Sequence, residues 1–461
     1  MFHKVNNIHF VGIGGIGMSG IAELLINLGF SISGSDLAES EITKKLKKNG
    51  AKIYRGHNKR NIIDAEVIVY SSAVPKNNPE LMAAKTLKIP IIKRAEMLGE
   101  LIALKQTSIG VAGTHGKTST SSMLGALLTY GKMDPTLVVG GLVQNLNTNS
   151  LLGQSDFIVV EADEYDKSFL QMKPTLAIIN NIEEEHMDCY EDIDDLHKSF
   201  IQYANSVPFY GGVAVCIDSI GVQEILSKIK RPIITYGISE QATIKANDIN
   251  YNEQETSYTL YKNNKKCGKV KLNVPGKHNV LNSLAAIAIG FELGLDEKTI
   301  INGINSYYGV RRRFEIKGEC KGIMVVDDYA HHPTEVEATL EAAKKGWNRR
   351  IISVFQPHLF SRTKTFYNEF ARAFMNSDIL LVTEIYPARE KPIDGISGKL
   401  IFDAAKAKGH KNVHFINDLE KINITLDKIT KKNDMVITIG AGTIWRYGQS
   451  YFEHLSNNTG A

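Results

Sequence analysis

The sequence has little of what marks secreted, disulfide-built or membrane proteins. Only four of its 461 residues are cysteine, and no two of them form a CxxC pair. This spacing argues against a disulfide framework or a thiolate zinc site and favours a reducing cytoplasm. No apolar run reaches the ~18 residues of a membrane helix, and the N-terminus lacks a signal-peptide layout. We therefore expect a cytoplasmic protein that does not enter the membrane.

A large excess of one charge is also missing, and proline is scarce. With 54 basic and 50 acidic side chains, the formal net charge of +4 is too small to require a nucleic acid or an anionic membrane as partner. Twelve prolines and a hydrophobic share of 43% exclude a largely disordered chain. At about 150 residues per domain, the length predicts roughly three domains.

Short apolar runs, each followed by polar or glycine-rich residues and then a helix-like stretch, recur along the whole chain. Such runs are typical of strands that a parallel sheet buries on both faces. The fold class is therefore predicted to be α/β, and ligands should bind beyond the carboxyl ends of the strands. The expected strands are residues 8–11, 109–112, 157–160, 176–179, 323–326, 351–355, 379–382 and 436–439.

Breaks in this periodicity indicate where the domains meet. A first boundary is expected near 105–107, after the helical pattern of 95–104, and a second around 310–322. Residues 243–274 alternate polar and apolar side chains, which predicts an antiparallel hairpin inside the middle domain. We therefore divide the chain into residues 1–105, 106–315 and 316–461.

A glycine-rich loop directly follows the first expected strand. Its Gly12, Gly14 and Gly17 form the pattern G-x-G-x-x-G, and Gly15 lies between them. Asp36 comes 19 residues after Gly17, at the end of the next strand-like run. Such a loop lets the backbone approach a diphosphate at a helix N-terminus, with an acid placed for a ribose hydroxyl. A nicotinamide cofactor and a UDP-sugar both fit the pattern, and a purely structural turn is the remaining alternative.

A second glycine-rich stretch lies between an expected strand and a helical pattern. Its backbone N–H groups and Lys117 would contact the phosphates of a nucleoside triphosphate, and Thr118 would ligate Mg²⁺. The strict Walker spacing requires glycine at position 111, where this chain has valine. An ordinary loop with an exposed lysine is the alternative. The predicted site residues are Gly113, Thr114, His115, Gly116, Lys117, Thr118 and Ser119.

Acidic residues and a histidine follow the next two expected strands. Glu161 opens the sequence EADEYD, and His186 follows three glutamates at 183–185. Carboxylate and imidazole side chains near a phosphate-binding loop suit Mg²⁺. Either run alone would more simply be a solvated helix start, but two such runs at consecutive strand ends favour a metal site.

Two further polar patterns each have a structural and a functional interpretation. Asn279 and Asn282 open an alanine-rich helical stretch, where they would either cap the helix or contact a nucleotide. Arg313 belongs to a run of three arginines, which is either a phosphate-binding site or a solvated basic linker.

The last third of the chain places polar residues after two neighbouring expected strands. Asp328, Tyr329 and His331 follow one strand, and His358 with Arg362 follows the other. An arginine near histidines at neighbouring strand ends fits the binding of a free carboxylate. Zinc binding by the histidine pair at 331–332 is the alternative, although no third ligand stands at a diagnostic spacing.

Taken in order, eight motifs resemble the Mur ligase family across essentially the full length of the chain. The family's loop resembles G-T-x-G-K-T, so the valine at position 111 is no departure from it. Leu359 is a departure, because the family often has arginine after the histidine of the QPH motif. The motifs are GIGGIGMSG (12–20), GTHGKTST (113–120), EADE (161–164), NNIEEEHMD (180–188), GKHNVLNSLAA (276–286), RRRF (311–314), DDYAHHPTE (327–335) and FQPHLFSRT (355–363).

The resemblance implies three domains with separate ligands. A Rossmann-like N-terminal domain would bind a UDP-sugar, a P-loop-type central domain would bind ATP, and a Rossmann-like C-terminal domain would bind an amino acid. The implied residues are Gly12, Gly14, Gly15, Gly17 and Asp36 for the UDP-sugar; 113–119, Asn279, Asn282 and Arg313 for ATP; Thr118, Glu161 and His186 for Mg²⁺; and Tyr329, His331, His358 and Arg362 for the amino acid.

The resemblance also implies an activity. It is the ATP-dependent ligation of L-alanine to UDP-N-acetylmuramate through an acyl phosphate, in peptidoglycan precursor synthesis, with no nucleic-acid or membrane partner. The catalytic residues would be Lys117, Glu161, His186, Arg313 and Asp328. Three alternatives are a nicotinamide oxidoreductase, which leaves Lys117 without a role, a related ligase that attaches a whole peptide, and a non-catalytic UDP-sugar sensor. The oligomeric state is not predicted.

Overall fold

The computed structural model describes residues 5–71, 73–143, 148–187, 189–388 and 390–457, and these pack into two compact units. No helix among the described residues is long and apolar enough to span a membrane. No disulfide joins the four cysteines. The first unit comprises residues 1–247, 259–270 and 281–307, and the second comprises 248–258, 271–280 and 308–461.

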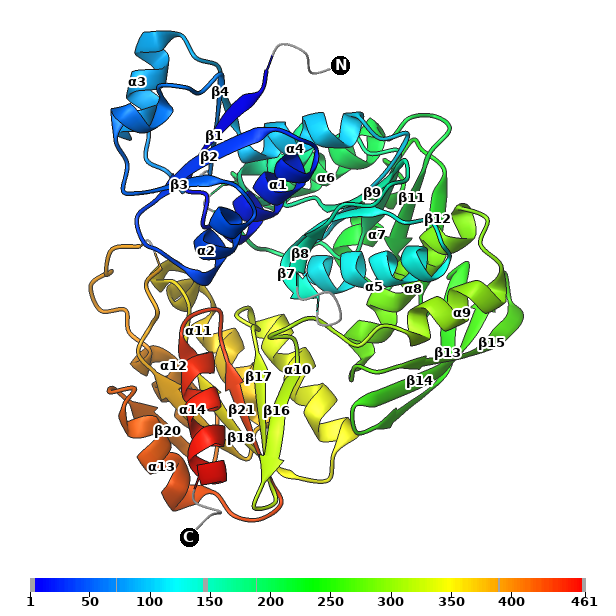
Figure 1. Cartoon of the computed structure of the whole chain (residues 1–461). Helices are drawn as coiled ribbons and strands as arrows, with labels where there is room; N and C mark the ends of the chain where they lie inside the picture. Colours follow the sequence, from blue (N-terminus) through cyan, green and yellow to red (C-terminus); the bar gives the residue numbers. More distant parts are fainter. Residues whose placement is uncertain (1–4, 72, 144–147, 188, 389, 458–461) are drawn as a thin grey trace. The chain divides into compact units, whose positions relative to one another are not determined.

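The first sheet, coloured blue in Figure 1, has five parallel strands in the order β3-β2-β1-β4-β5. The strand order reverses on either side of β1, which is where ligands bind in open parallel sheets. Its elements are β1 (Asn7–Val11), α1 (Ile16–Asn27), β2 (Ser31–Asp36), α2 (Glu41–Lys48), β3 (Lys52–Arg55), the 3-10 helix η1 (Lys59–Ile62), β4 (Val67–Tyr70), α3 (Pro79–Leu87), β5 (Ile91–Lys93) and α4 (Arg94–Ala103).

The second sheet has ten strands in the order β15-β14-β13-β12-β11-β10-β6-β9-β7-β8. Its central strands β10, β6 and β9 are parallel, so their carboxyl ends lie at one edge. Its elements are β6 (Thr107–Ala112), α5 (Lys117–Tyr130), β7 (Thr136–Val143), β8 (Thr148–Leu151), β9 (Phe157–Glu161), the 3-10 helix η2 (Tyr165–Gln171), β10 (Leu176–Ile179), α6 (Ile193–Ser206), β11 (Gly212–Cys216), α7 (Ile220–Leu226), β12 (Ile233–Gly237), β13 (Ile244–Asn252), β14 (Glu255–Lys262), β15 (Lys265–Leu272), α8 (Lys277–Glu292) and α9 (Glu297–Asn305).

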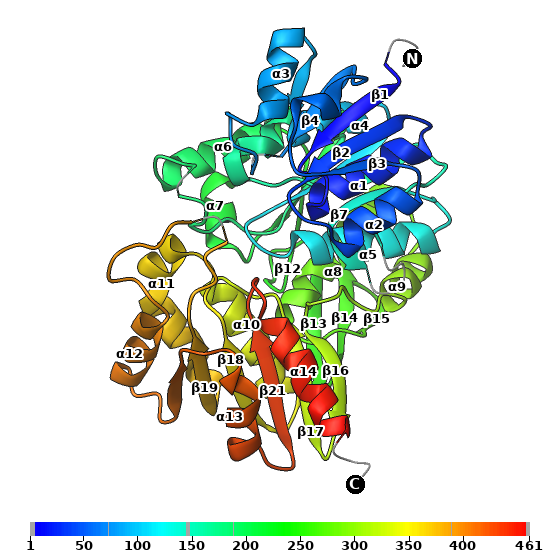
Figure 2. The same ribbon diagram turned by 60° about the vertical axis from the view of Figure 1, so that its left-hand side comes forward.

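The third sheet has the order β16-β17-β21-β18-β19-β20, and β16 is its one antiparallel edge strand among the described residues. Helices α10, α11 and α12 cover one face, and α13 and α14 cover the other (Figure 2). Its elements are β16 (Glu315–Cys320), β17 (Ile323–Asp328), α10 (Pro333–Gly346), β18 (Arg350–Phe355), α11 (Phe360–Ala373), the 3-10 helix η3 (Phe374–Asn376), β19 (Ile379–Thr383), α12 (Lys399–Ala407), β20 (Val413–Ile416), α13 (Lys421–Ile429), β21 (Asp434–Ile439) and α14 (Ile444–Asn457).

The α/β class with three sheets confirms the predicted fold class, and all eight expected strands are present. One local expectation needs correction. Residues 243–274 form three strands, β13 to β15, because the alternating pattern contains a second turn near residue 253. The break at 310–322 contains β16, whose exposed edge explains why its residues lack the buried apolar run of a central strand. The domain boundaries at 105 and 315 stay predictions.

Candidate active site

The first glycine loop is held by the end of β2. Gly12 has a φ of 81°, in the left-handed region that favours glycine, and its N–H donates to the Ser35 carbonyl at 2.9 Å. The Gly14 N–H donates to Oδ2 of Asp36 at 2.8 Å. The sequence pattern assigned Asp36 to a ribose hydroxyl, and the structure shows that the same carboxylate also fixes the loop.

The two remaining glycines of the motif stand at the start of α1. Gly15 is the N-cap residue of that helix, with extended backbone angles. Gly17 lies in the first helical turn, where the guanidinium of Arg94 packs against it. Arg94 is the first residue of α4. The sequence motifs did not single it out, because 77 residues separate Arg94 from Gly17.

A buried carboxylate, that of Glu80, contacts the strand end that holds the first glycine loop. Glu80, in α3, accepts hydrogen bonds from the Ser35 hydroxyl at 2.6 Å and from Asn61 at 2.6 Å. The rings of His57 and His9 lie 3.1 Å and 3.8 Å from the same carboxylate. Burial alone would raise the pKa of Glu80, but the neighbouring His9 ring and the hydrogen bonds from Ser35 and Asn61 outweigh it and lower the pKa to about 2. Glu80 is therefore a charged anchor at neutral pH.

The second glycine loop links β6 to α5, as predicted. Gly113 and Gly116 have φ angles of 135° and 82°, which side chains rarely adopt. A Cβ atom at Gly113 would lie 3.1 Å from the backbone nitrogen of Asn180, so the loop packs directly on the strand end of β10. The Asn180 amide donates to the Thr120 hydroxyl at 3.1 Å, and that hydroxyl donates to Asn282 at 3.2 Å. Asn282 is thus placed at this loop.

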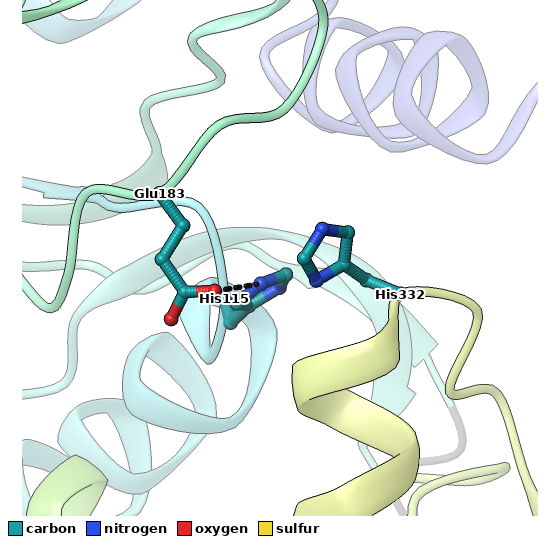
Figure 3. Close-up of side chains that lie close together, drawn as sticks. All are labelled: His115, Glu183 and His332. Atoms are coloured by element: carbon teal, nitrogen blue, oxygen red, sulfur yellow. Dashed lines mark ion pairs between the residues drawn. The ribbon is translucent and has the colours of Figure 1, made fainter. Parts of the chain in front are cut away.

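The same loop is tied to the residues that follow β10. The Thr114 N–H donates to the Asn181 carbonyl at 3.1 Å, and the His115 N–H donates to Oδ1 of Asn181 at 2.7 Å. In return, the Glu183 N–H donates to the Thr114 hydroxyl at 2.9 Å. The His115 ring forms an ion pair with Glu183 at 3.5 Å, drawn as a dashed line in Figure 3. The two loops therefore form one hydrogen-bonded body.

Lys117, the first residue of α5, is directed back toward its own loop. Its Nζ donates to the Gly113 carbonyl at 2.7 Å and to Oε2 of Glu164 at 2.6 Å, and it lies 3.9 Å from Asp163. Burial alone would lower the pKa of Lys117, but the charges of Glu164 and Asp163 outweigh this effect and raise it. Burial raises the pKa of Glu164 to about 7, against the opposing charge of Lys117. The EADE motif contained the signal for this pairing, which sequence reasoning missed.

Acidic groups and one imidazole gather beside Lys117. Asp163, Glu164 and His186 offer ligand atoms that all lie within 4.8 Å of one another. Glu161 is not part of this trio; its carboxylate accepts the Gly140 N–H at 2.6 Å.

Thr118 and Ser119 follow Lys117 in the first turn of α5. Thr118 hydrogen-bonds to Glu161 through its side chain, and Ser119 is buried in the helix. Burial raises the pKa of Glu161, although the hydrogen bonds from Gly140 and Thr118 lower it. A nearby cation would therefore favour the charged form of this carboxylate. The hard oxygen donors of Glu161 and Thr118 fit Mg²⁺.

In the second unit, Asp328 closes β17 and is buried. Its two oxygens accept the N–H groups of Phe314 and Ala330, each at 2.7 Å. Burial nevertheless raises the pKa of Asp328 to about 6. Arg313 forms an ion pair with Glu335 at 3.4 Å. Burial alone would lower the pKa of Arg313, but the charges of Glu335 and Asp328 raise it. Glu335 is a further partner that the motif reading missed.

The start of α8 holds Asn279, one of the predicted nucleotide contacts. The Asn279 side-chain amide donates to the Pro275 carbonyl at 2.8 Å, a local bond to the residue four positions earlier. Next to it, burial and the Arg313 charge lower the pKa of His278 to about 4. His278 is therefore neutral at pH 7 and leaves the positive charge of this region to the arginine.

The predicted carboxylate-binding residues lie together. Nδ1 of His331 is 3.0 Å from the Tyr329 carbonyl, and its ring centroid is 6.0 Å from that of His358. His358 lies 3.2 Å from the guanidinium of Arg362, which is only 9% exposed. Tyr386, which the sequence motifs did not indicate, stacks on His358 with centroids 5.8 Å apart. These side chains form one connected polar cluster at the strand ends of the third sheet.

Family models match three successive parts of the chain. They are described as "Mur ligase family, catalytic domain" for residues 7–106, "Mur ligase middle domain" for 111–290, and "Mur ligase, glutamate ligase domain" for 312–442. A UDP-N-acetylmuramate--L-alanine ligase from Geotalea uraniireducens (strain Rf4) is 47% identical over 99% of this chain and 100% of its own length. One from Salinibacter ruber (strain DSM 13855 / M31) is 46% identical over 99% and 96%.

Solved structures show the same relationship. The crystal structure of the UDP-N-acetylmuramate-alanine ligase MurC from Thermotoga maritima matches with a TM-score of 0.83 and 30% identity, covering 98% of this chain and 99% of its own. A murein peptide ligase from Psychrobacter arcticus 273-4 matches with a TM-score of 0.72 and 25% identity, covering 98% and 99%. Family models and relatives alike span nearly the full length, so this chain belongs to the Mur ligase family.

Proposed function

We propose that this protein joins L-alanine to the carboxylate of UDP-N-acetylmuramate with ATP, releasing ADP and phosphate, in peptidoglycan precursor synthesis. Relatives of this activity are 46–47% identical over nearly the whole chain. The single observation that carries the proposal is Lys117 at the P-loop, paired at 2.6 Å with the buried Glu164. The first glycine loop, whose pattern is typical of diphosphate binding, belongs to the same unit.

The chemistry follows from the leaving group. A carboxylate does not condense with an amine at pH 7, because oxide is a very poor leaving group. In the proposed path, a carboxylate oxygen attacks the γ-phosphorus of ATP, the bond from that phosphorus to the bridging oxygen breaks, and ADP leaves. The alanine amine then attacks the acyl carbon, the C–O bond to phosphate breaks, and the amine loses a proton.

The chain's own residues position the reactants and neutralise their charge, which is the protein's main task in phosphoryl transfer. Lys117 would place its ammonium group on the phosphates. The backbone N–H groups of the loop at 113–116 would hold the phosphate oxygens. Glu164 accepts a hydrogen bond from Lys117 at 2.6 Å and so keeps the ammonium group beside the loop.

We further propose that Thr118, Glu161 and His186 hold Mg²⁺. The raised pKa of the half-buried Glu161 carboxylate and its hydrogen bond with Thr118 support this role. When bound, Mg²⁺ would supply positive charge to the phosphate oxygens. Asp163 and Glu164 enlarge the set of oxygen donors around His186.

In the second unit, Tyr329, His331, His358 and Arg362 are proposed to bind the amino acid. The 3.2 Å contact between His358 and Arg362 orients a planar guanidinium, which matches a carboxylate in a bidentate way. Arg313 and Asp328 are proposed as catalytic residues of the same unit. We also propose that the protein acts in the cytoplasm, in keeping with the absence of a disulfide among its cysteines.

A phosphate-release assay with a panel of acceptors tests the proposal. The full-length protein, ATP, Mg²⁺ and UDP-N-acetylmuramate are combined with L-alanine, other small amino acids or a tripeptide. We expect release that depends on L-alanine and is much slower with the tripeptide. Preference for the tripeptide would instead assign the peptide-ligase activity of the Psychrobacter arcticus neighbour. Binding of the UDP-sugar without any phosphate release would identify a sensor, and the proposal would be wrong.

A further inference from the structure

The guanidinium of Arg94 occupies the space that a side chain at position 17 would need. A Cβ atom built on Gly17 would lie 3.4 Å from Cζ and 3.5 Å from Cδ of Arg94, and closer still to Nη1. Gly17 is helical and is not one of the glycines with positive φ. Backbone freedom therefore does not explain glycine here, whereas room for the guanidinium does.

The other side of the same guanidinium faces the acidic loop after β9. Nη2 of Arg94 lies 3.7 Å from Oδ2 of Asp163, and the second oxygen of Asp163 lies 3.9 Å from Nζ of Lys117. The side chains of Arg94 and Asp163 are 32% and 37% exposed, so a ligand can reach both. The first glycine loop and the P-loop lysine are thus connected through one arginine and one aspartate.

We propose that Arg94 is a binding residue for the diphosphate of the nucleotide sugar, and that Asp163 orients it before the ligand arrives. This inference rests on the proposed function, because that function places a diphosphate at the loop of Gly12 to Gly17. Backbone N–H groups carry only partial charge, whereas a diphosphate brings full negative charges. A guanidinium adds a full positive charge and a planar set of donors that matches phosphate oxygens.

The neighbouring residue provides a matched control. Lys93 also carries a positive charge at the start of α4, and it pairs with Asp166 at 3.1 Å. Its side chain is 52% exposed. The three atoms nearest to a Cβ built on Gly17 all belong to Arg94 and not to Lys93. Lys93→Ala therefore removes the same charge and a similar ion pair without touching the proposed diphosphate contact.

Binding of UDP-N-acetylmuramate to the full-length protein is measured by calorimetry, with KM values for both nucleotides. We expect Arg94→Ala to raise the Kd for the UDP-sugar at least about tenfold, the size typical for a lost charged hydrogen bond. Arg94→Lys should raise it less, and Lys93→Ala by less than about twofold. The KM for ATP should stay within about twofold in all three variants, a split that general misfolding would not produce.

A double-mutant cycle tests the reason for glycine at position 17. Because the guanidinium is the end of a flexible side chain, Gly17→Ala should displace it at little cost in stability and weaken UDP-sugar binding. In the Arg94→Ala background the same Gly17→Ala change should have almost no further effect. Equal losses in both backgrounds, or wild-type affinity in Arg94→Ala, would overturn the inference. Failure of the wild-type protein to bind the UDP-sugar would instead overturn the proposed function and the inference with it.

Discussion

Replacing Lys117 by alanine tests the central site most directly. The change removes an ammonium group that donates to the Gly113 carbonyl and to Glu164. It leaves the loop backbone in place, because the hydrogen bonds between the two loops involve Thr114, His115 and Asn181 instead. The variant therefore separates the charge of the lysine from the shape of the loop.

The expected size of the effect follows from the role of the lysine. Loss of a donor that stabilises charge in the transition state lowers the rate on the order of a thousandfold, or roughly 4 kcal/mol. The fold should survive. Glu164 loses its partner, but burial already raises the pKa of this carboxyl to about 7, and removing the Lys117 charge, which lowers that pKa, lets Glu164 take up a proton and avoid a buried uncompensated charge.

The assay compares phosphate release with UDP-sugar binding in the same preparations. Lys117→Ala should abolish release and bind the UDP-sugar with wild-type affinity, since the first glycine loop is untouched. Lys167→Ala is the control, because that lysine also pairs with a carboxylate, Asp195 at 2.8 Å, which lies in α6 and not in the P-loop. A Lys117→Ala protein with more than about half of the wild-type activity would refute the ATPase assignment.

Three further predictions concern the metal, the amino acid and stability. Glu161→Ala and His186→Ala should each raise the Mg²⁺ concentration needed for half-maximal activity, and Mn²⁺ should substitute in part; unchanged metal titrations would remove both residues from the metal site. Arg362→Lys should raise the KM for L-alanine at least about tenfold, or roughly 1.4 kcal/mol, with little change for ATP or the UDP-sugar; steady-state kinetics in which the ATP constant moved instead would assign Arg362 to the phosphates. Because the pKa of Glu80 is lowered from 4.5 to about 2, its ionised form should stabilise the fold by roughly 3 kcal/mol above pH 4.5, and this stabilisation should disappear as the pH falls toward 2. The free energies of unfolding of the wild type and of Glu80→Gln, measured across this pH range, test this prediction. If the stability advantage of the wild type grew as the pH fell, the prediction would be wrong.

Local sequence patterns predicted those features that depend on neighbouring residues. Strands such as β10 and β17 were found because their residues are buried without interruption. The two glycine loops could be predicted because a tight turn between a strand and a helix requires glycines at a characteristic spacing. For Asn282 the sequence allows two roles, a helix cap or a nucleotide contact. Only the fold brings this residue to Thr120, 162 residues away in the chain.

Partners that fold from distant parts of the chain left no local signal. Arg94 reaches Gly17 and Asp163 only because α4 follows the edge strand of the first sheet. Glu335 stands in the motif DDYAHHPTE (327–335), but nothing in that motif indicates its ion pair with Arg313. The antiparallel β16 was missed for a related reason, since an edge strand that is half-buried lacks a continuous apolar run.

The hydrogen bonds between the loops after β6 and β10 have a consequence for how nucleotide is captured. Because Asn181 and Thr114 hold each other's loop through backbone groups, the phosphate-binding backbone is ordered before any ligand arrives. Binding of a nucleotide therefore costs little free energy for ordering the protein, and the affinity is set by the contacts between the loop and the phosphates. The same interlock means that an insertion in either loop would misplace the other, so the two segments can change in length only together.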